Sequence, residues 1–207
     1  MYRLYQFQSS GNCYKIRLLL TQLQLPFECH EIDILNGESR TEAFLNINPN
    51  GRIPVLELAP GDYLSESNAI LAYLAEDTPF NVSDRRSRAA VWQWLFFEQY
   101  SHEPYIATSR FWRAILKDSD TYREALQQKQ APGYAALGVL DQALKQSDFL
   151  VENRYSIADI ALFAYTHLAD EGGFDLAPFP HVLAWIERVK AQPNYISILE
   201  EVGCPTV

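Results

Sequence analysis

The sequence predicts a small α/β domain followed by an all-helical domain. Two observations lead to this prediction. Strand-like segments are confined to about the first 77 residues, and beyond them the apolar residues recur at helical spacing. The 207 residues are enough for one large domain or two small ones with a buried core. We expect the domains to cover residues 1–78 and 84–207, joined through the segment TPFNVSD.

In the first domain, short β-rich segments alternate with segments of helical spacing. The expected elements are a strand at 2–7, a helix at 13–25, a strand at 27–34, a short helix near 39–47, a hairpin of strands at 53–58 and 62–64, and a helix at 66–76. A β-α-β unit followed by a hairpin and a helix is the thioredoxin-like layout. It is built on a mixed four-stranded sheet.

The second domain contains only helical patterns. They cover residues 85–104, 122–144, 156–169 and 180–191. Ser156-Ile157-Ala158-Asp159 has the spacing of a capping box, in which Ser156 caps forward and Asp159 reaches back to the start of the helix. This motif is expected to fix the helix that carries the core of the second domain.

Composition and charge exclude several classes of protein. The net charge of −9 disfavours a nucleic acid or an anionic membrane as partner, because both attract basic surfaces. No apolar run is long enough to span a bilayer, and Lys15 and Arg17 interrupt the first apolar run, so no signal peptide is expected. The three cysteines are an odd number and have no close spacing, which indicates a reducing compartment and not a disulfide scaffold. We therefore expect a cytoplasmic protein.

The residues that commonly hold metals or nucleotides do not form a pattern. The four histidines are scattered without the spacing of metal ligands, and neither a dinucleotide nor a P-loop motif is present. No metal cofactor is expected.

Ser10-Gly11-Asn12-Cys13 opens the first helix, and small polar groups at that place have two interpretations. Ser10 is a favourable N-cap on purely local grounds. Alternatively, the helix start is a site, because its unpaired N–H groups and positive dipole end stabilise a thiolate. The spacing is that of Cys-x-x-Cys with serine first. A hydroxyl at Ser10 cannot form a disulfide, but it can donate a hydrogen bond to an incoming thiolate.

Two further motifs permit either a structural or a ligand-binding role. Ile53-Pro54 opens a strand where thioredoxin-like domains have a cis proline, and that proline leaves the preceding main chain able to pair with a peptide-like ligand. Glu66-Ser67 opens the helix after the hairpin. Ser67 is an apt cap, and the pair is also suited to a zwitterionic head group, with Glu66 facing the ammonium and the helix start facing the carboxylate.

Taken together, these motifs resemble the cytosolic glutathione transferase family, in its bacterial serine-type or nu-like classes, along the whole chain. The matching segments are Ser9–Cys13, Asn50–Leu56, Glu66–Leu71 and Ser156–Asp159.

The resemblance implies that glutathione is the co-substrate. Its γ-glutamyl end would meet Glu66 and Ser67, and its cysteinyl main chain would pair with Ile53 before Pro54, with Arg52 nearby. The sulfur would point at Ser10. In classes with Thr-Pro-Asn at this place, Ser10 falls on the threonine and Asn12 on the asparagine, so that Asn12 becomes a second donor. Ser9 is the alternative contact for the sulfur.

For the rest of the chain, the resemblance implies a homodimer and a pocket for an electrophile between the domains. The candidate wall residues are Tyr105, Ser109, Trp112 and Arg113, although aromatic residues at helical spacing also suit a core. The leading hypothesis is a glutathione transferase that attacks a hydrophobic electrophile. The alternatives are a glutathione-dependent disulfide-bond reductase, favoured by Asn12, and a non-catalytic relative that only binds or regulates.

Overall fold

The computed structural model describes residues 1–203, and the chain forms two compact units. The first unit is Met1–Glu76 together with the C-terminal segment from Pro193, and the second is Asp77–Gln192. The sequence predicts one helical domain over residues 84–207. The segment from Pro193 instead packs on the first unit, because the Tyr14 hydroxyl donates to the carbonyl of Ile196 (2.7 Å) and Arg17 donates to that of Ile198 (2.7 Å).

The first unit has the expected α/β architecture. Its elements are β1 (Tyr2–Gln6), α1 (Gly11–Gln22), β2 (Phe27–Glu31), η1 (Glu38–Arg40), α2 (Glu42–Ile47), β3 (Val55–Ala59), β4 (Asp62–Ser65) and α3 (Ser67–Ala75). The sheet order is β2-β1-β3-β4. β1 and β2 are parallel, whereas β3 is antiparallel to both β1 and β4. The predicted thioredoxin-like layout with a mixed four-stranded sheet is thus confirmed.

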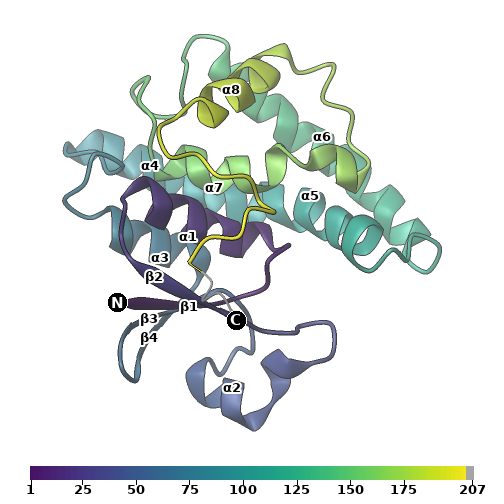
Figure 1. The fold of residues 1–207 in the computed structure, drawn as a ribbon. Coiled ribbons are helices and arrows are strands. Elements are labelled where there is room, and N and C mark those ends of the chain that lie inside the picture. The colour runs from purple at the N-terminus through teal and green to yellow at the C-terminus, as the bar shows by residue number, and fades with distance from the viewer. Residues whose placement is uncertain (204–207) are drawn as a thin grey trace. The chain divides into compact units, whose positions relative to one another are not determined.

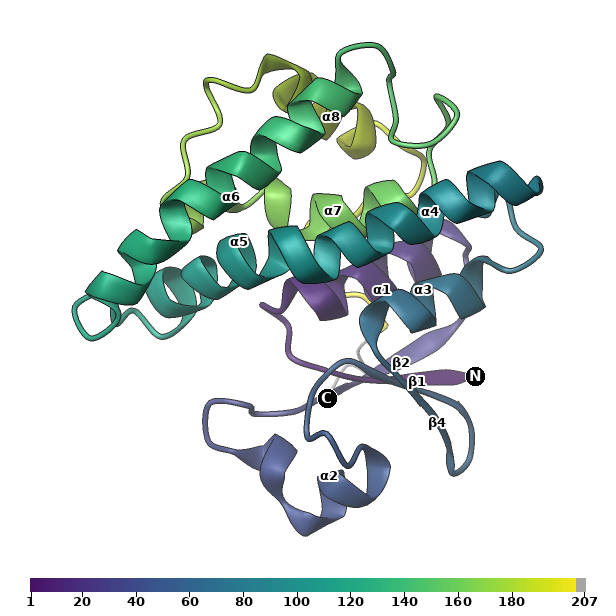
Figure 2. The same cartoon turned by 180° about the vertical axis from the view of Figure 1, so that it is seen from behind.

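Helices cover both faces of this sheet. In Figures 1 and 2, α1 and α3 lie on one face and α2 lies on the other. Leu4 and Leu56 are paired in register and fully buried. Because side chains alternate along a strand, Tyr5 and Val55 point the other way, where they pack with Phe44 of α2.

Helix α1 is buried along most of its length, including its two cations. The side chains of Lys15 and Arg17 are fully buried. Buried charges are costly unless they are hydrogen-bonded. Arg17 meets this requirement by donating to the carbonyls of Gln8 (2.9 Å) and Ile198, and to the side-chain oxygen of Gln6.

The second unit is helical throughout. Its elements are α4 (Arg85–Phe97), η2 (Glu98–His102), α5 (Glu103–Arg110), η3 (Phe111–Ile115), α6 (Arg123–Leu144), α7 (Ile157–Thr166), η4 (Ala169–Gly172) and α8 (Pro180–Lys190). Figure 2 shows α4 and α5 following one another along nearly the same axis. The sequence predicted a single helix over 85–104. One π-helical turn, η2, separates α4 from α5, which has Pro104 in its first turn. Of the helices within residues 1–203, none combines the length and apolarity that a membrane span requires.

The predicted capping box at the start of α7 is confirmed. Ser156 Oγ accepts from the N–H of Ala158 (3.3 Å), and the Asp159 carboxylate accepts from the N–H of Ser156 (3.0 Å). Asp159 also accepts from the N–H of Leu150 (3.0 Å) and from Nε1 of Trp185 (2.9 Å). One buried carboxylate therefore joins the start of α7, the preceding loop and α8.

Candidate functional site

The strand register brings the three predicted motifs of the first unit to one end of the sheet. Tyr5 near the end of β1 pairs with Val55 at the start of β3, and Val55 pairs with Ser65 at the end of β4. The chain leaves β1 toward Ser10, enters β3 through Ile53-Pro54, and leaves β4 into Glu66-Ser67. All three segments therefore meet at this end.

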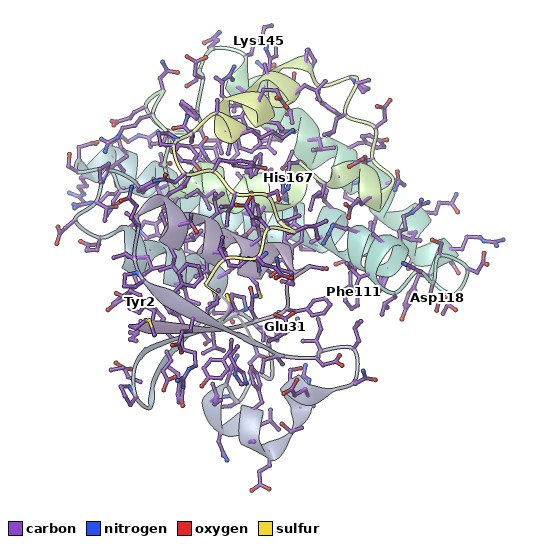
Figure 3. The ribbon with its side chains drawn as sticks, viewed as in Figure 1. Tyr2, Glu31, Phe111, Asp118, Lys145 and His167 are labelled. Atoms are coloured by element: carbon purple, nitrogen blue, oxygen red, sulfur yellow. The ribbon has the colours of Figure 1, made fainter. Side chains whose placement is uncertain are left out.

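The loop between β1 and α1 is held by Glu31, at the end of β2 (Figure 3). Its carboxylate accepts from the main-chain N–H of Gln8 (2.5 Å) and from the side-chain amide of Gln6 (3.1 Å). These bonds fix the path of the chain immediately before Ser10.

Ser10 is the N-cap of α1, with an extended backbone (φ −76°, ψ 124°). Its Oγ accepts from the N–H of Cys13 at 3.4 Å. The capping interpretation of Ser10 is thus confirmed, and it is compatible with a second role. An accepting hydroxyl keeps its own proton to donate, and the positive end of the α1 dipole lies beside it.

Cys13 is fully buried one helical turn after Ser10. Burial is the largest influence on its thiol and raises the pKa to about 11, against an ordinary value of 9.0. The thiol is therefore protonated at neutral pH. The motif S-x-x-C supplies a hydroxyl at its first position and a packing group at its last position.

The peptide bond between Ile53 and Pro54 is cis, as predicted. Pro54 is buried, while the Arg52 side chain is exposed and its carbonyl accepts from the side chain of Asn48 (2.7 Å). Across residues 1–203, neither the N–H nor the carbonyl of Ile53 makes a hydrogen bond within the chain. This main chain can therefore pair with a peptide-like ligand.

The start of α3 differs from the sequence expectation. The N-cap is Glu66, whose side chain makes no capping bond, and Ser67 is the first helical residue. Ser67 is buried, and its hydroxyl bonds to other side chains in place of the helix N–H groups. Glu66 is exposed with φ at +70°, a backbone conformation that costs a non-glycine residue about 1–3 kcal/mol and is concentrated at functional sites.

A side-chain network joins the starts of α1 and α3. Ser67 Oγ donates to Asn12 Oδ1 (3.2 Å), and Lys15 Nζ donates to Ser67 Oγ (3.3 Å) and to Asn68 Oδ1 (3.5 Å). Asn12 and Ser67 were predicted as site residues, but Lys15 was not. A lysine inside the apolar run of α1 was the available indication, since such a residue has to find partners when the helix is buried.

The four residues predicted to line the electrophile pocket lie within α5 and η3 of the second unit. The Trp112 ring stacks on Tyr122, with centroids 4.5 Å apart, and Lys129 Nζ lies 5.2 Å from the same ring and 5.7 Å from that of Tyr105. Ser109 is fully buried, and its hydroxyl donates to the carbonyl of Tyr105 (2.6 Å).

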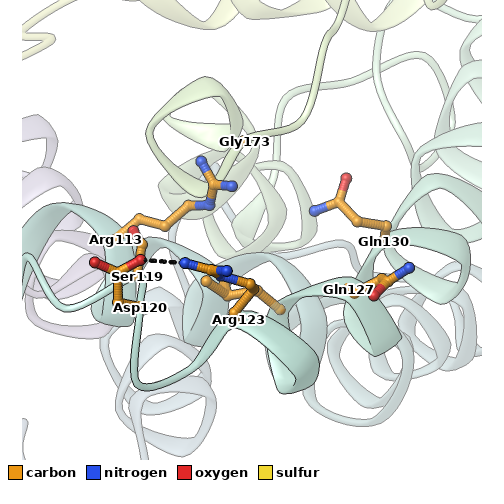
Figure 4. A pocket seen from close by; sticks show the side chains of 8 residues that line it. Arg113, Ser119, Asp120, Arg123, Gln127, Gln130 and Gly173 are labelled. Atoms are coloured by element: carbon orange, nitrogen blue, oxygen red, sulfur yellow. Dashed lines mark hydrogen bonds and ion pairs between the residues drawn. The ribbon is translucent and has the colours of Figure 1, made fainter.

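Arg113, the fourth of these residues, lines an open pocket of about 410 Å³ in the second unit (Figure 4). The polar residues around this pocket are Arg113, Ser119, Asp120, Arg123, Gln127 and Gln130. Arg123 is paired with Asp120 (2.7 Å). Sequence patterns do not predict this pocket, because its walls combine the end of η3, a loop, the first turns of α6 and Gly173.

The described residues 1–203 contain no cluster of three or more histidine, cysteine, aspartate or glutamate side chains placed to hold a metal ion. The groups gathered at the candidate site are a hydroxyl, an amide, two helix N-termini and a cis-proline strand entrance. A thioredoxin-like unit followed by a helical unit defines a class of two-unit proteins by its fold.

Comparison with known proteins identifies the family within this class. Residues 4–81 match the glutathione S-transferase N-terminal domain, and residues 94–193 match the glutathione S-transferase C-terminal domain. The chain belongs to the glutathione S-transferase family.

Individual relatives agree with this assignment over nearly the whole chain. The crystal structure of a glutathione S-transferase from Pseudomonas fluorescens Pf-5 is 51% identical, with a TM-score of 0.94 over 96% of this chain and 99% of that one. The disulfide-bond oxidoreductase YfcG of Escherichia coli K12 is 33% identical over 90% of this chain and 89% of its own length. A structure of Ure2p in complex with glutathione is 25% identical, with a TM-score of 0.83 over 96% of this chain and 93% of that one.

Proposed function

We propose that the chain is a glutathione transferase that holds the glutathione sulfur as a thiolate at the start of α1, for attack on a hydrophobic electrophile. The observation that carries the proposal is the hydrogen bond between Ser67 and Asn12, which joins the starts of α1 and α3 at one end of the sheet. Family membership and the similarity to Ure2p in its glutathione complex support glutathione as the ligand.

The tripeptide would bind along this end of the sheet. Its γ-glutamyl carboxylate would accept from the N–H groups that open α3, near Ser67, and its ammonium would face the Glu66 carboxylate. The cysteinyl main chain would pair with Ile53 before Pro54, and the exposed Arg52 would lie beside the same strand entrance.

At the start of α1, the Ser10 hydroxyl and the Asn12 amide would donate to the sulfur. The thiol proton passes to solvent, the thiolate forms a C–S bond with the electrophilic carbon, and the leaving group departs with the electron pair of its own bond. A hydrogen bond to a charged group contributes about 1.5–3 kcal/mol. Each donor can therefore lower the pKa of the bound thiol by about one to two units.

Ser10→Ala and Asn12→Ala test the roles of the two donors. The pKa of bound glutathione is measured by titrating thiolate absorbance at saturating glutathione, alongside the conjugation rate with a chloronitroarene. We expect each variant to raise the thiol pKa by about one unit and to lower the rate about tenfold below that pKa.

Two further variants complete the series. Ser83→Ala is the matched control, since Ser83 is an exposed serine of the other unit. Ser9→Ala tests the alternative serine. An unchanged pKa in Ser10→Ala together with a raised pKa in Ser9→Ala would transfer the role to Ser9. Absence of binding heat with reduced glutathione at millimolar concentration would refute the proposal as a whole.

A second candidate function is glutathione-dependent disulfide reduction. The presence of Asn12 favours it, as does the 33% identity to the disulfide-bond oxidoreductase YfcG. Because the buried Cys13 thiol is protonated, the attacking thiolate would again be glutathione. It would displace the thiol of a mixed glutathione disulfide as a thiolate, leaving oxidised glutathione. A higher kcat/KM for a mixed disulfide than for a chloronitroarene would select this function.

For the electrophile, we propose contacts with Tyr105, Trp112 and Arg113. Ser109 is left out of the proposed set because it is fully buried and its hydroxyl already donates to a main-chain carbonyl. The assignment is tested by measuring, in the wild type and in Trp112→Ala, how strongly candidate electrophiles compete with the conjugation reaction.

We also propose that the chain forms a homodimer, as the family resemblance implies. Trp92, Phe96 and Tyr100 recur at four-residue spacing along α4 and η2, and their exposed fractions are 45%, 67% and 84%. A sedimentation mass of one chain at micromolar concentration would exclude the dimer.

A further inference from the structure

A buried lysine follows Ser10 and Asn12 of the proposed sulfur site along α1. The Lys15 side chain has no exposed surface, whereas Ser10 and Asn12 at the start of the same helix are half-buried. Its Nζ reaches across to α3, donating to Ser67 Oγ (3.3 Å) and to Asn68 Oδ1 (3.5 Å). An ammonium group so deeply buried has its position fixed by these polar contacts.

The donor inventory of these groups gives the network a direction. An ammonium has three donors and no acceptor, so Ser67 Oγ accepts from Lys15. The single hydroxyl proton of Ser67 is then directed to Asn12 Oδ1, 3.2 Å away. With Oδ1 accepting from Ser67, the NH₂ group lies on the opposite side of the planar Asn12 amide.

We propose that Lys15 is a positioning residue for the sulfur site, which acts through Ser67 to orient the Asn12 amide so that its NH₂ group donates to the glutathione sulfur. This inference rests on the proposed function. Its physical basis is the difference between the two ends of an amide. The NH₂ end stabilises a thiolate, whereas a carbonyl oxygen turned toward the same anion repels it.

The network also gives the buried cation of α1 a physical role. Without the Lys15 ammonium, the Ser67 hydroxyl can accept from Asn12 as readily as it can donate to it. Both orientations of the Asn12 amide then satisfy Ser67, and only one of them presents a donor to the sulfur. Lys15 occupies one of the two acceptor positions of the Ser67 oxygen, which favours the orientation in which the Ser67 proton goes to Asn12 Oδ1, and it does so without touching the ligand.

The test is a double-mutant cycle between Lys15→Met and Asn12→Ala, with the pKa of bound glutathione as the readout. Methionine keeps an unbranched side chain of similar length at position 15 and removes the donor. We expect Lys15→Met alone to raise the thiol pKa by about one unit, a tenfold loss of thiolate at lower pH. In the Asn12→Ala background, the same substitution should leave the pKa unchanged.

The cycle separates positioning from simple electrostatics. A buried positive charge also stabilises an anion directly, and that effect would persist after Asn12 is removed. Increments that add in the double variant would therefore overturn the proposal, as would an unchanged pKa in Lys15→Met. Lys117→Met, at an exposed lysine of the other unit, is the matched control.

A second pair of variants keeps the test decisive if Lys15→Met does not fold. Ser67→Ala removes the hydroxyl that links Lys15 to Asn12, and Ser67→Thr keeps it. We expect the thiol pKa, measured at saturating glutathione, to rise by about one unit for alanine, a tenfold change in the ionisation constant, and to be restored by threonine. Equal values for the two variants would overturn the proposal.

One measurement needs no ligand and separates this inference from the proposed function. The side-chain NH₂ resonances of Asn12 are compared by NMR in the wild type and in Lys15→Met, without glutathione. A changed chemical shift is expected in Lys15→Met and not in Lys117→Met. If the resonances do not move, the orienting role of Lys15 fails even where glutathione binds. If glutathione does not bind while the resonances move, only the proposed function fails.

Discussion

Replacing Asp159 by alanine should destabilise the second unit by an amount that depends on pH. The carboxylate is fully buried and accepts three N–H donors, from Leu150, Ser156 and Trp185, at 2.9–3.0 Å. Each buried donor left without an acceptor costs about 1–3 kcal/mol. At neutral pH, Asp159→Ala should therefore lower the free energy of unfolding by at least about 3 kcal/mol.

The pH dependence follows from the state of the carboxyl group itself. Burial is the largest influence and raises the pKa of Asp159 to about 6, from an ordinary value of 3.8. The folded protein thus holds this proton more tightly than the unfolded chain. The resulting stability is fully present below the unfolded pKa and is lost as the pH rises through about 6. This gain amounts to about 3 kcal/mol at full protonation, and to about 2 kcal/mol at about pH 4.

Urea unfolding of the wild type and Asp159→Ala, followed by tryptophan fluorescence, measures this effect. All four tryptophans lie in residues 77–192, so the fluorescence reports the second unit. The cost of the substitution should increase from about 3 kcal/mol near pH 7 to about 5 kcal/mol near pH 4. Glu124→Ala, at an exposed acid on α6, should change stability by less than about 0.5 kcal/mol. A cost of Asp159→Ala that is equal at both pH values, or larger near pH 7, would refute the reasoning.

Two further predictions concern the packing of the second unit. A methyl group at Gly133 of α6 would overlap the Phe174 ring, whereas one at Gly138 meets nothing within 4 Å. In urea unfolding, Gly133→Ala should cost about 1–3 kcal/mol and Gly138→Ala should gain up to about 1 kcal/mol, and equal effects would contradict the packing argument. Burial lowers the pKa of His167 to about 4 from 6.5, so its stabilising contribution is present above about pH 6.5 and is lost as the pH falls toward 4. His167→Phe keeps the stacking on Phe163. In this variant, the loss of stability between about pH 7 and pH 4 should be smaller than in the wild type by about 3 kcal/mol. An undiminished loss would contradict this prediction.

The proposed site shows how one residue can serve both stability and function. Ser10 caps α1 through its oxygen and keeps its proton available, so the capping and ligand-binding interpretations are compatible. Ser67 shows the opposite outcome. Its hydroxyl is bonded to Asn12 and Lys15, and it therefore does not cap α3. The choice between capping and another partner depends on what the fold brings within reach.

The sequence by itself determined the class of most segments and the start of the helix that Ser156 caps. Alternation over residues 2–7 and helical spacing after Asp77 indicate which residues are buried. This periodicity can be recognised without knowing which element packs against the segment. The capping box at Ser156 and Asp159 is equally local, because both of its hydrogen bonds close within four residues. The cis bond before Pro54 was expected from the thioredoxin-like order of elements.

Only the tertiary structure decided which distant groups meet. The segment from Pro193 joins the first unit through main-chain carbonyls that accept from Tyr14 and Arg17, and a carbonyl accepts regardless of which side chain its residue carries. Lys15 likewise donates to Ser67, a residue far away in the sequence, and no spacing pattern along the chain predicts this contact. Periodicity records burial, whereas the partner of a buried polar group is set by how the helices and the sheet pack together.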